Sequence, residues 1–165
     1  MPILGRPGQA AKAIHSGEAF ALWSQLMLRY QNLEMTTIHQ NFIHDLEFKL
    51  LVGRWITQNL QVEIKEIENK LNLYGIPLPP RPPKSINTPV NSEVIRDQFV
   101  FLQILSGLQY FLGLQVSDLR ILLNDDLRAM FTRFLKRQLD AYDSMVKYGK
   151  IKGWLGNPPE YRTTQ

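Results

Sequence analysis

The sequence contains no cysteine among its 165 residues. Disulfide bonds, thiolate metal sites and cysteine nucleophiles are therefore excluded, and the redox compartment stays undecided. The first 18 residues also lack an apolar run of signal-peptide length, so we expect no export by a standard route. The length predicts a single domain that can build a hydrophobic core without metal or disulfide support.

A strong charge of one sign is missing as well. The formal net charge is +4 and the sequence pI is about 9.4, which is a mild basic bias. In the segment 128–152 the basic residues alternate with acidic ones, as on a solvated helix face, and the aromatic residues fall at core positions. The sequence has no glycine-rich phosphate loop and no serine in a nucleophile motif. We therefore expect no nucleic-acid partner and no enzymatic activity.

What the sequence does contain is four long segments with apolar residues at every third or fourth position, without strand-like alternation. This pattern predicts an all-α four-helix bundle. We expect a mobile N-terminal arm over 1–15, the bundle over 16–149 and a tail over 150–165 that docks on the bundle through Trp154. The predicted helices cover 17–42, 45–74, 91–119 and 124–148.

The ends of these helices are marked by residues suited to capping. Ser16, Asp45 and Asn124 precede helical segments, where a short polar side chain can accept the free N–H groups of the first turn. Gly75 and Gly149 follow the second and fourth segments, where a left-handed residue usually ends a helix.

The segment 76–91 contains six prolines and predicts an extended linker, because proline fixes its backbone and has no N–H to donate. At ~3.1 Å per residue it can reach roughly 50 Å, about the length of the second helix. The linker can therefore return the chain to the opposite end of the bundle. We expect a long crossover, with the direction of the third helix left open.

The third segment has no charged residue between Asp97 and Asp118, a length that could cross a membrane. Glutamines recur through it at Gln98, Gln103 and Gln109, and no basic flank anchors its ends. We expect no membrane insertion and instead a helix buried on most sides, with its surplus apolar residues covered by the linker or by a partner subunit.

A bundle of this length raises the question whether its core holds two metal ions. Di-iron bundles use Glu-x-x-His pairs, because residues three apart share a helix face. None of the three histidines has an acidic residue three positions before it, and the carboxylates fall outside the apolar stripes. We expect no cofactor.

The stripes instead carry neutral polar residues, which are costly to bury unless they are hydrogen-bonded. One interpretation is an internal hydrogen-bonded network that fixes the register of the helices, and the other is a small polar cavity; we favour the network. Its predicted members are Thr37, Asn41, Thr57, Gln98 and Gln138.

His44 and Asp45 at the first turn resemble an acid–base pair, but a turn aspartate is usually a cap and a neighbouring histidine is usually structural. An alternative hypothesis is a divergent bundle that binds a metal or a small ligand through His39, His44 and Asp45.

Three stretches together resemble a known family: LWSQLMLRY leading to NFIHDLEFKLL, YGIPLPPRPP, and NDDLRAMF with the closing YGKIKGWLGNPPEY. They resemble the ferritin-like, spore-coat-protein-F-like bundles of spore-forming bacteria. This resemblance implies a ferritin-like bundle with one long crossover and a cytoplasmic protein that assembles into the spore coat. It implies no established activity. With the apolar surplus of the third helix, it predicts a structural or interaction protein that forms a homodimer and contacts other coat proteins.

Overall fold

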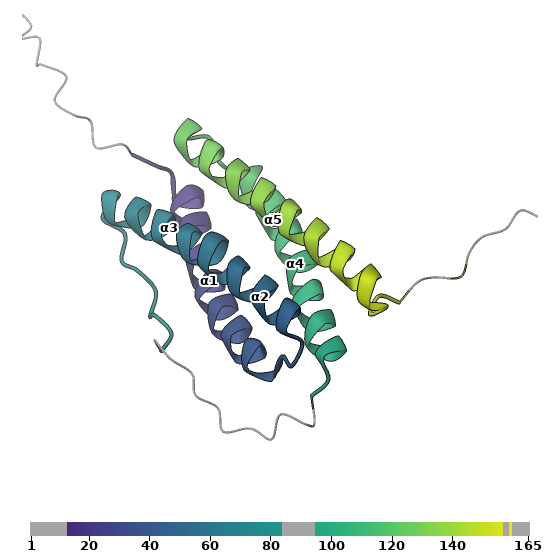
Figure 1. Cartoon of the computed structure of the whole chain (residues 1–165). Helices are drawn as coiled ribbons and strands as arrows, with labels where there is room; N and C mark the ends of the chain where they lie inside the picture. Colours follow the sequence, from purple (N-terminus) through teal and green to yellow (C-terminus); the bar gives the residue numbers. More distant parts are fainter. Residues whose placement is uncertain (1–12, 84–94, 157–158, 160–165) are drawn as a thin grey trace, which may run out of the picture.

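The computed structural model describes residues 13–83, 95–156 and 159, and this part of the chain is all-helical, without a strand. It forms four long helices (Figure 1). The second is continuous through a π-helical turn. The elements are α1 (Ser16–Phe42), α2 (Leu46–Trp55), η1 (Ile56–Leu60), α3 (Gln61–Leu73), α4 (Asp97–Leu119) and α5 (Asp125–Lys152).

The four helices form two antiparallel hairpins, α1 with α2–η1–α3 and α4 with α5 (Figure 1). The start of α4 lies at the start of α2, where Asp97 accepts hydrogen bonds from the N–H groups of His44 and Asp45. The end of α4 lies at the start of α1, where Glu18 meets the turn that leads into α5. Helix α4 therefore runs parallel to α2 and α3.

The two turns of the hairpins are capped reciprocally by buried or half-buried carboxylates. Asp97 of the second hairpin holds the α1–α2 turn at 2.9 and 2.7 Å. Glu18 of the first hairpin accepts the N–H groups of Leu123 and Asn124 at 2.7 and 2.6 Å. Burial opposes the ionisation of Glu18, but these N–H donors outweigh it, and its pKa is lowered.

Most predicted helix ends agree with the structure, and three do not. Asp45 and Asn124 cap α2 and α5 as expected, but α1 is capped by His15, which forms a capping box with Glu18, and not by Ser16. Helix α4 begins at Asp97, six residues after the predicted position 91, which lies outside the described residues together with the rest of 84–94.

Glycine ends two helices through the same backbone motif. Gly75 has a left-handed φ of 67°, and the N–H of Ile76 bonds back to the carbonyl of Leu71, as predicted for the end of the second helix. The fourth helix continues past Gly149 and ends at Gly153, which has the same φ. The predicted end at Gly149 was wrong. This glycine lies inside α5, where it is buried against the ring of Phe101.

The π-turn η1 changes which side of the second helix faces the core. A stripe of regular three- and four-residue steps through 45–74 would place Leu46, Leu50 and Thr57 in the core, but all three are exposed. The buried residues follow steps of four, Phe48, Val52, Ile56, Leu60 and Ile64. Steps of four drift around a regular helix of 3.6 residues per turn. The wider turn, in which the N–H of Gln61 bonds to the carbonyl of Ile56, absorbs this drift.

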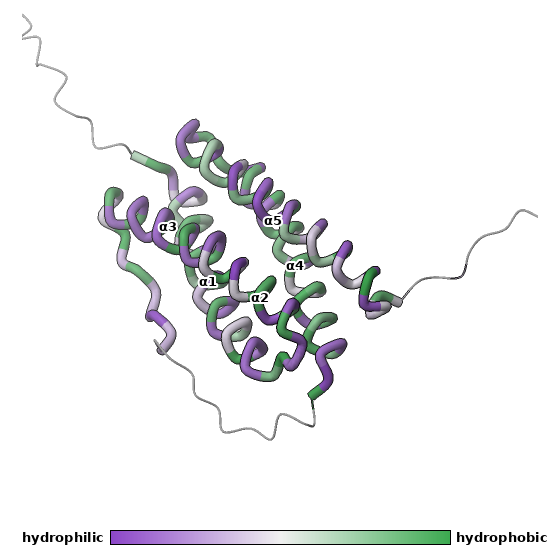
Figure 2. Tube along the Cα trace, viewed as in Figure 1, coloured by the Kyte–Doolittle hydropathy of each residue, from purple (hydrophilic) through white to green (hydrophobic). Residues whose placement is uncertain are grey.

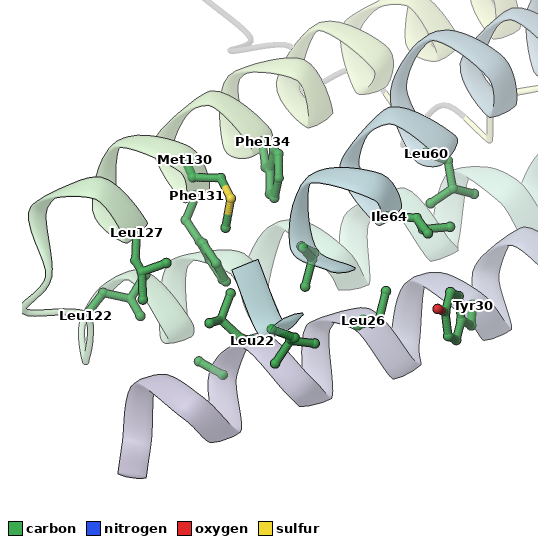
Figure 3. Close-up of a cluster of buried hydrophobic side chains, with 13 residues drawn as sticks. Leu22, Leu26, Tyr30, Leu60, Ile64, Leu122, Leu127, Met130, Phe131 and Phe134 are labelled. Atoms are coloured by element: carbon green, nitrogen blue, oxygen red, sulfur yellow. The ribbon is translucent and has the colours of Figure 1, made fainter. Parts of the chain in front are cut away.

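The core is divided into two apolar clusters along the bundle, and hydrophobic residues alternate with polar ones along each helix (Figure 2). The first cluster draws on three helices, with Leu26 from α1, Ile64 from α3 and Phe131 from α5 (Figure 3). The second cluster contains Phe48 and Phe101 beneath Trp154, whose ring centroid lies 5.6 Å from each of theirs. The C-terminal residues around Trp154 thus pack onto the bundle.

Helix α4 buries one face, so the expectation that it is buried on most sides was wrong. Its buried side packs on α5 and α1. By length and composition it could cross a membrane, with 39% of its most apolar window buried inside the molecule. Its other side exposes Phe99, Leu102, Tyr110 and Val116.

Candidate functional site

The middle of the bundle holds a buried ion pair between Arg29 of α1 and Glu63 of α3. Their side chains are 1% and 6% exposed, and the Nε and Nη2 atoms of Arg29 both lie 2.9 Å from Oε2 of Glu63. The guanidinium also lies 5.0 Å from the ring centroid of Phe134 on α5, as in a cation–π contact. This one side chain of α1 therefore links three of the four long helices.

Polar side chains extend this pair to the fourth helix. Nη1 of Arg29 donates to the amide oxygen of Gln25, and the amide nitrogen of Gln25 donates to Asp118 of α4. Burial raises the pKa of Glu63, opposed by the nearby charge of Arg29. Burial likewise raises the pKa of Asp118, opposed by its bond from Gln25. We call Gln25, Arg29, Glu63 and Asp118 the polar centre.

The polar centre occupies the position where a metal-binding bundle would place its ligands. The guanidinium of Arg29 places a fixed positive charge at this position. It forms an ion pair with Glu63, the carboxylate that α3 contributes to the polar centre. Among the described residues, no group of three or more His, Asp or Glu side chains converges. The residues of the polar centre can therefore hold the helices in register, but they do not form a set of ligands for a cation.

A small cavity of about 10 Å³ adjoins the polar centre and is lined by Arg29, Glu63, Gln115 and Gln138 among others. Gln115 is 1% exposed, and neither polar atom of its amide has a hydrogen-bond partner in the described part of the chain. A buried amide of this kind is costly unless a small polar group joins it.

The five residues predicted to form an internal network do not form one. Asn41 and Thr57 are exposed, and the hydroxyls of Thr37 and Thr57 donate to carbonyl groups of their own helices. Gln98 donates to the carbonyl of Trp154 at 3.5 Å. Only Gln138 bridges buried helices, through a bond of 3.2 Å to the carbonyl of Leu108. The predicted network was wrong, because two of its members are exposed and the other three donate to separate backbone carbonyl groups.

The three candidate ligands His39, His44 and Asp45 do not come together as a metal site. His39 is half-buried, and burial lowers its pKa. His44 is exposed, with Nδ1 3.3 Å from Asp97. Asp45 is the cap of α2 and joins it to the end of α5.

Asp45 is held ionised by three donors. Its carboxylate accepts bonds from Lys152 at 2.8 Å, from the N–H of Phe48 at 3.0 Å and from the hydroxyl of Tyr148 at 2.9 Å. Lys152 and these hydrogen bonds lower the pKa of Asp45 from 3.8 to about 2. Desolvation and the Asp45 carboxylate raise the pKa of Tyr148 to about 12.

We predict that Asp45→Asn lowers the free energy of unfolding by about 2 kcal/mol at neutral pH, because asparagine keeps the cap but removes the charge. A lowered pKa stabilises the fold above the unfolded-state value, and this stability is lost as the pH falls from about 4 to about 2. Urea denaturation across this range should show the wild-type and variant curves converging at low pH. Asp143→Asn, which breaks an exposed pair with Lys147, is the control. Parallel curves would contradict this assignment.

Sequence reasoning missed Arg29 and Glu63, and it placed all carboxylates outside the core. Glu18, Glu63 and Glu68 are in fact buried. The buried face of α1 contains Leu22, Gln25 and Arg29 beside the apolar residues Leu26 and Tyr30. The only sequence signal for a buried polar pair on α1 is the four-residue spacing of Gln25 and Arg29. Polar residues on a solvated helix face show the same spacing, so this signal does not distinguish the two cases.

Comparison with known proteins agrees with this architecture. A solved structure from Bacillus halodurans C-125, described as a "putative spore coat protein", superimposes with a TM-score of 0.83 at 24% identity, over 92% of this chain and 98% of that chain. The uncharacterized protein YvdQ of Bacillus subtilis (strain 168) is 25% identical over 150 residues, which cover 88% of each chain. The family model described as "Protein of unknown function (DUF3231)" matches residues 6–165. The chain belongs to the DUF3231 family.

Proposed function

We propose that this protein is a non-enzymatic structural or interaction protein of the spore coat that acts as a homodimer. The description of the Bacillus halodurans structure supports the coat association. We further propose a ferritin-like bundle in which the proline-rich segment is a long crossover. The shared end of α2 and α4, joined by Asp97, His44 and Asp45, supports this topology.

The observation that carries the homodimer is the exposed face of α4. Phe99, Leu102, Tyr110 and Val116 are 51%, 38%, 63% and 48% exposed and lie on the solvent-facing side of the helix, with Phe99, Leu102 and Tyr110 nearest its middle. This helix has no charged residue from 98 to 117. An uncharged apolar stripe of this length marks an interaction surface, and a second copy is the partner that it fits without opposing charges.

The sequence of this exposed side suits an antiparallel pair of α4 helices, related by a two-fold axis that crosses them at the level of Leu108. Residues equidistant from the axis then face each other. Tyr110 would lie against Ser106 of the second copy, and Phe99 would lie against Ser117 of the second copy, so that each large ring meets a small side chain. Gly113 allows the two backbones to approach closely.

Sedimentation velocity at micromolar concentration tests this proposal. We expect a dimer for the wild-type chain and a monomer for Leu102→Glu/Tyr110→Glu, because four charges would be buried in the interface. Leu50→Glu is the matched control, since Leu50 is an exposed leucine of α2 and leaves the α4 face intact. A wild-type monomer would overturn the homodimer. Co-flotation of that monomer with lipid vesicles would assign the α4 face to a membrane instead.

A metal-binding bundle, the alternative from the sequence, gains no support from the donor set. The polar centre contains Arg29, and His39 lies in α1 whereas His44 lies in the turn before α2. The remaining alternative is a site for a small ligand. Such a site does not depend on whether the protein forms a dimer.

A further inference from the structure

A cleft of about 250 Å³ lies between the two hairpins, on the side formed by α2, η1 and α5. Its floor is apolar and is built from Leu51, Val52, Ile104, Leu108 and Met145. We call this space the hairpin cleft. It is separate from the exposed stripe of α4 and from the polar centre.

Both hairpins contribute to the walls of the cleft, α2 and η1 from the first and α4 and α5 from the second. Helix α5 has its closest backbone approach to α4 and is joined to the second helix by side chains, such as Arg137 with Glu66 and Tyr148 with Asp45. The π-turn forms part of the facing wall and contributes Gln58 and Asn59. Single π-turns inside helices occur frequently at functional sites, because they cost stability and turn extra side chains toward a ligand.

The lining of the cleft carries a surplus of positive charge. Arg54 of α2 makes no ion pair with any described residue. Arg137 of α5 lies 3.4 Å from Glu66, a carboxylate that Arg133 already holds at 2.9 Å. Asp140 is the one acidic residue among the described lining residues. Two arginines therefore face one carboxylate inside the cleft, and this favours an anion.

The inner end of the cleft leads to unsatisfied polar groups. Trp55, Asn59 and Arg137 line both the hairpin cleft and the small cavity beside the polar centre. That cavity contains the buried and unpartnered amide of Gln115. A polar head placed at this junction could be reached by the Arg137 guanidinium and by amide donors, while an apolar body would cover the floor outward.

We propose that the hairpin cleft binds a small organic anion, a monocarboxylate with an aliphatic body. Its carboxylate lies at Arg137 and Asn59, with Arg54 also in the lining, and its chain packs on Ile104, Leu108 and Met145. Both halves of the bundle contribute to the site, so the ligand bridges the two hairpins.

Isothermal titration of the full chain with decanoate tests this site. We expect saturable one-to-one binding, weakened about ten-fold by Arg137→Gln, the loss of about 1.4 kcal/mol for one charge-assisted contact. Arg133→Gln is the matched control, because Arg133 is on the same helix and shares Glu66 but does not line the cleft. Decyltrimethylammonium, with the same chain and the opposite charge, should bind at least about ten-fold more weakly.

A second variant tests the apolar floor independently of charge. Ala141→Leu adds volume inside the cleft and should weaken decanoate binding while thermal unfolding still shows one cooperative transition. Binding that is equal in wild type, Arg137→Gln and Ala141→Leu would overturn the proposal, as would equal binding of the cation. The assay does not depend on self-association, so a monomeric protein could still confirm the cleft.

Discussion

Replacing Arg29 with methionine should lower the free energy of unfolding by about 3–5 kcal/mol, because it leaves Glu63 buried without its partner. Glu63 is 4% exposed, and both Nε and Nη2 of Arg29 contact its carboxylate. In the variant, burial acts unopposed and raises the pKa of Glu63 further. A carboxyl group with a raised pKa is least costly when protonated, so the variant should lose stability as the pH rises from about 4 to about 7.

Chemical denaturation at several pH values measures this effect. Arg29→Met/Glu63→Met should recover most of the loss, because removing both members of a buried pair is often neutral. Lys147→Met breaks an exposed pair with Asp143 and should change stability little, because solvent screens that pair. If Arg29→Met were as mild as Lys147→Met, the polar centre would not be a stabilising element.

Replacing Gly149 with alanine should lower the free energy of unfolding by about 2 kcal/mol, although alanine is the better helix former. Helix propensity alone would favour alanine by ~1 kcal/mol. The added Cβ would overlap with the ring carbon Cζ of Phe101 and come within 3.0 Å of Leu155. Overpacking a fixed aromatic core costs up to ~3 kcal/mol, which exceeds the propensity gain.

A double-mutant cycle identifies the clash as the cause. Phe101→Leu removes the ring atoms that the new Cβ would meet. Gly149→Ala should therefore cost much less in the Phe101→Leu background than alone, with a coupling of at least about 1 kcal/mol in thermal or urea unfolding. Equal costs in both backgrounds would show that Gly149 is not constrained by Phe101.

The four helices were predictable because their signals are local. Asp45 and Asn124 accept from the first-turn N–H groups next to them, and Gly75 takes the left-handed conformation at the position where the apolar stripe stops. These interactions involve residues at most a few positions apart, so a sequence pattern contains them. The positions of Gly153 and Gly149 show the limit. Either glycine could end the helix locally, and only packing against Phe101 decides between them.

The polar centre was not predictable because its parts come from distant segments. Arg29 and Glu63 are 34 residues apart, and Gln25 and Asp118 are 93 apart. The π-turn at Ile56–Leu60 added a second obstacle, since a regular helical stripe assigned Leu46 and Leu50 to the core in place of Phe48 and Val52. A periodic pattern assumes one helical pitch, and the chain uses two.

The reciprocal caps at Glu18 and Asp97 have a consequence for how the molecule comes apart. If the hairpins separated, the loop amides at His44, Asp45, Leu123 and Asn124 would lose their acceptors at the same moment. Neither hairpin can therefore separate without removing the hydrogen bonds that cap the turn of the other hairpin. We therefore expect the two hairpins to separate cooperatively, without a populated half-open form.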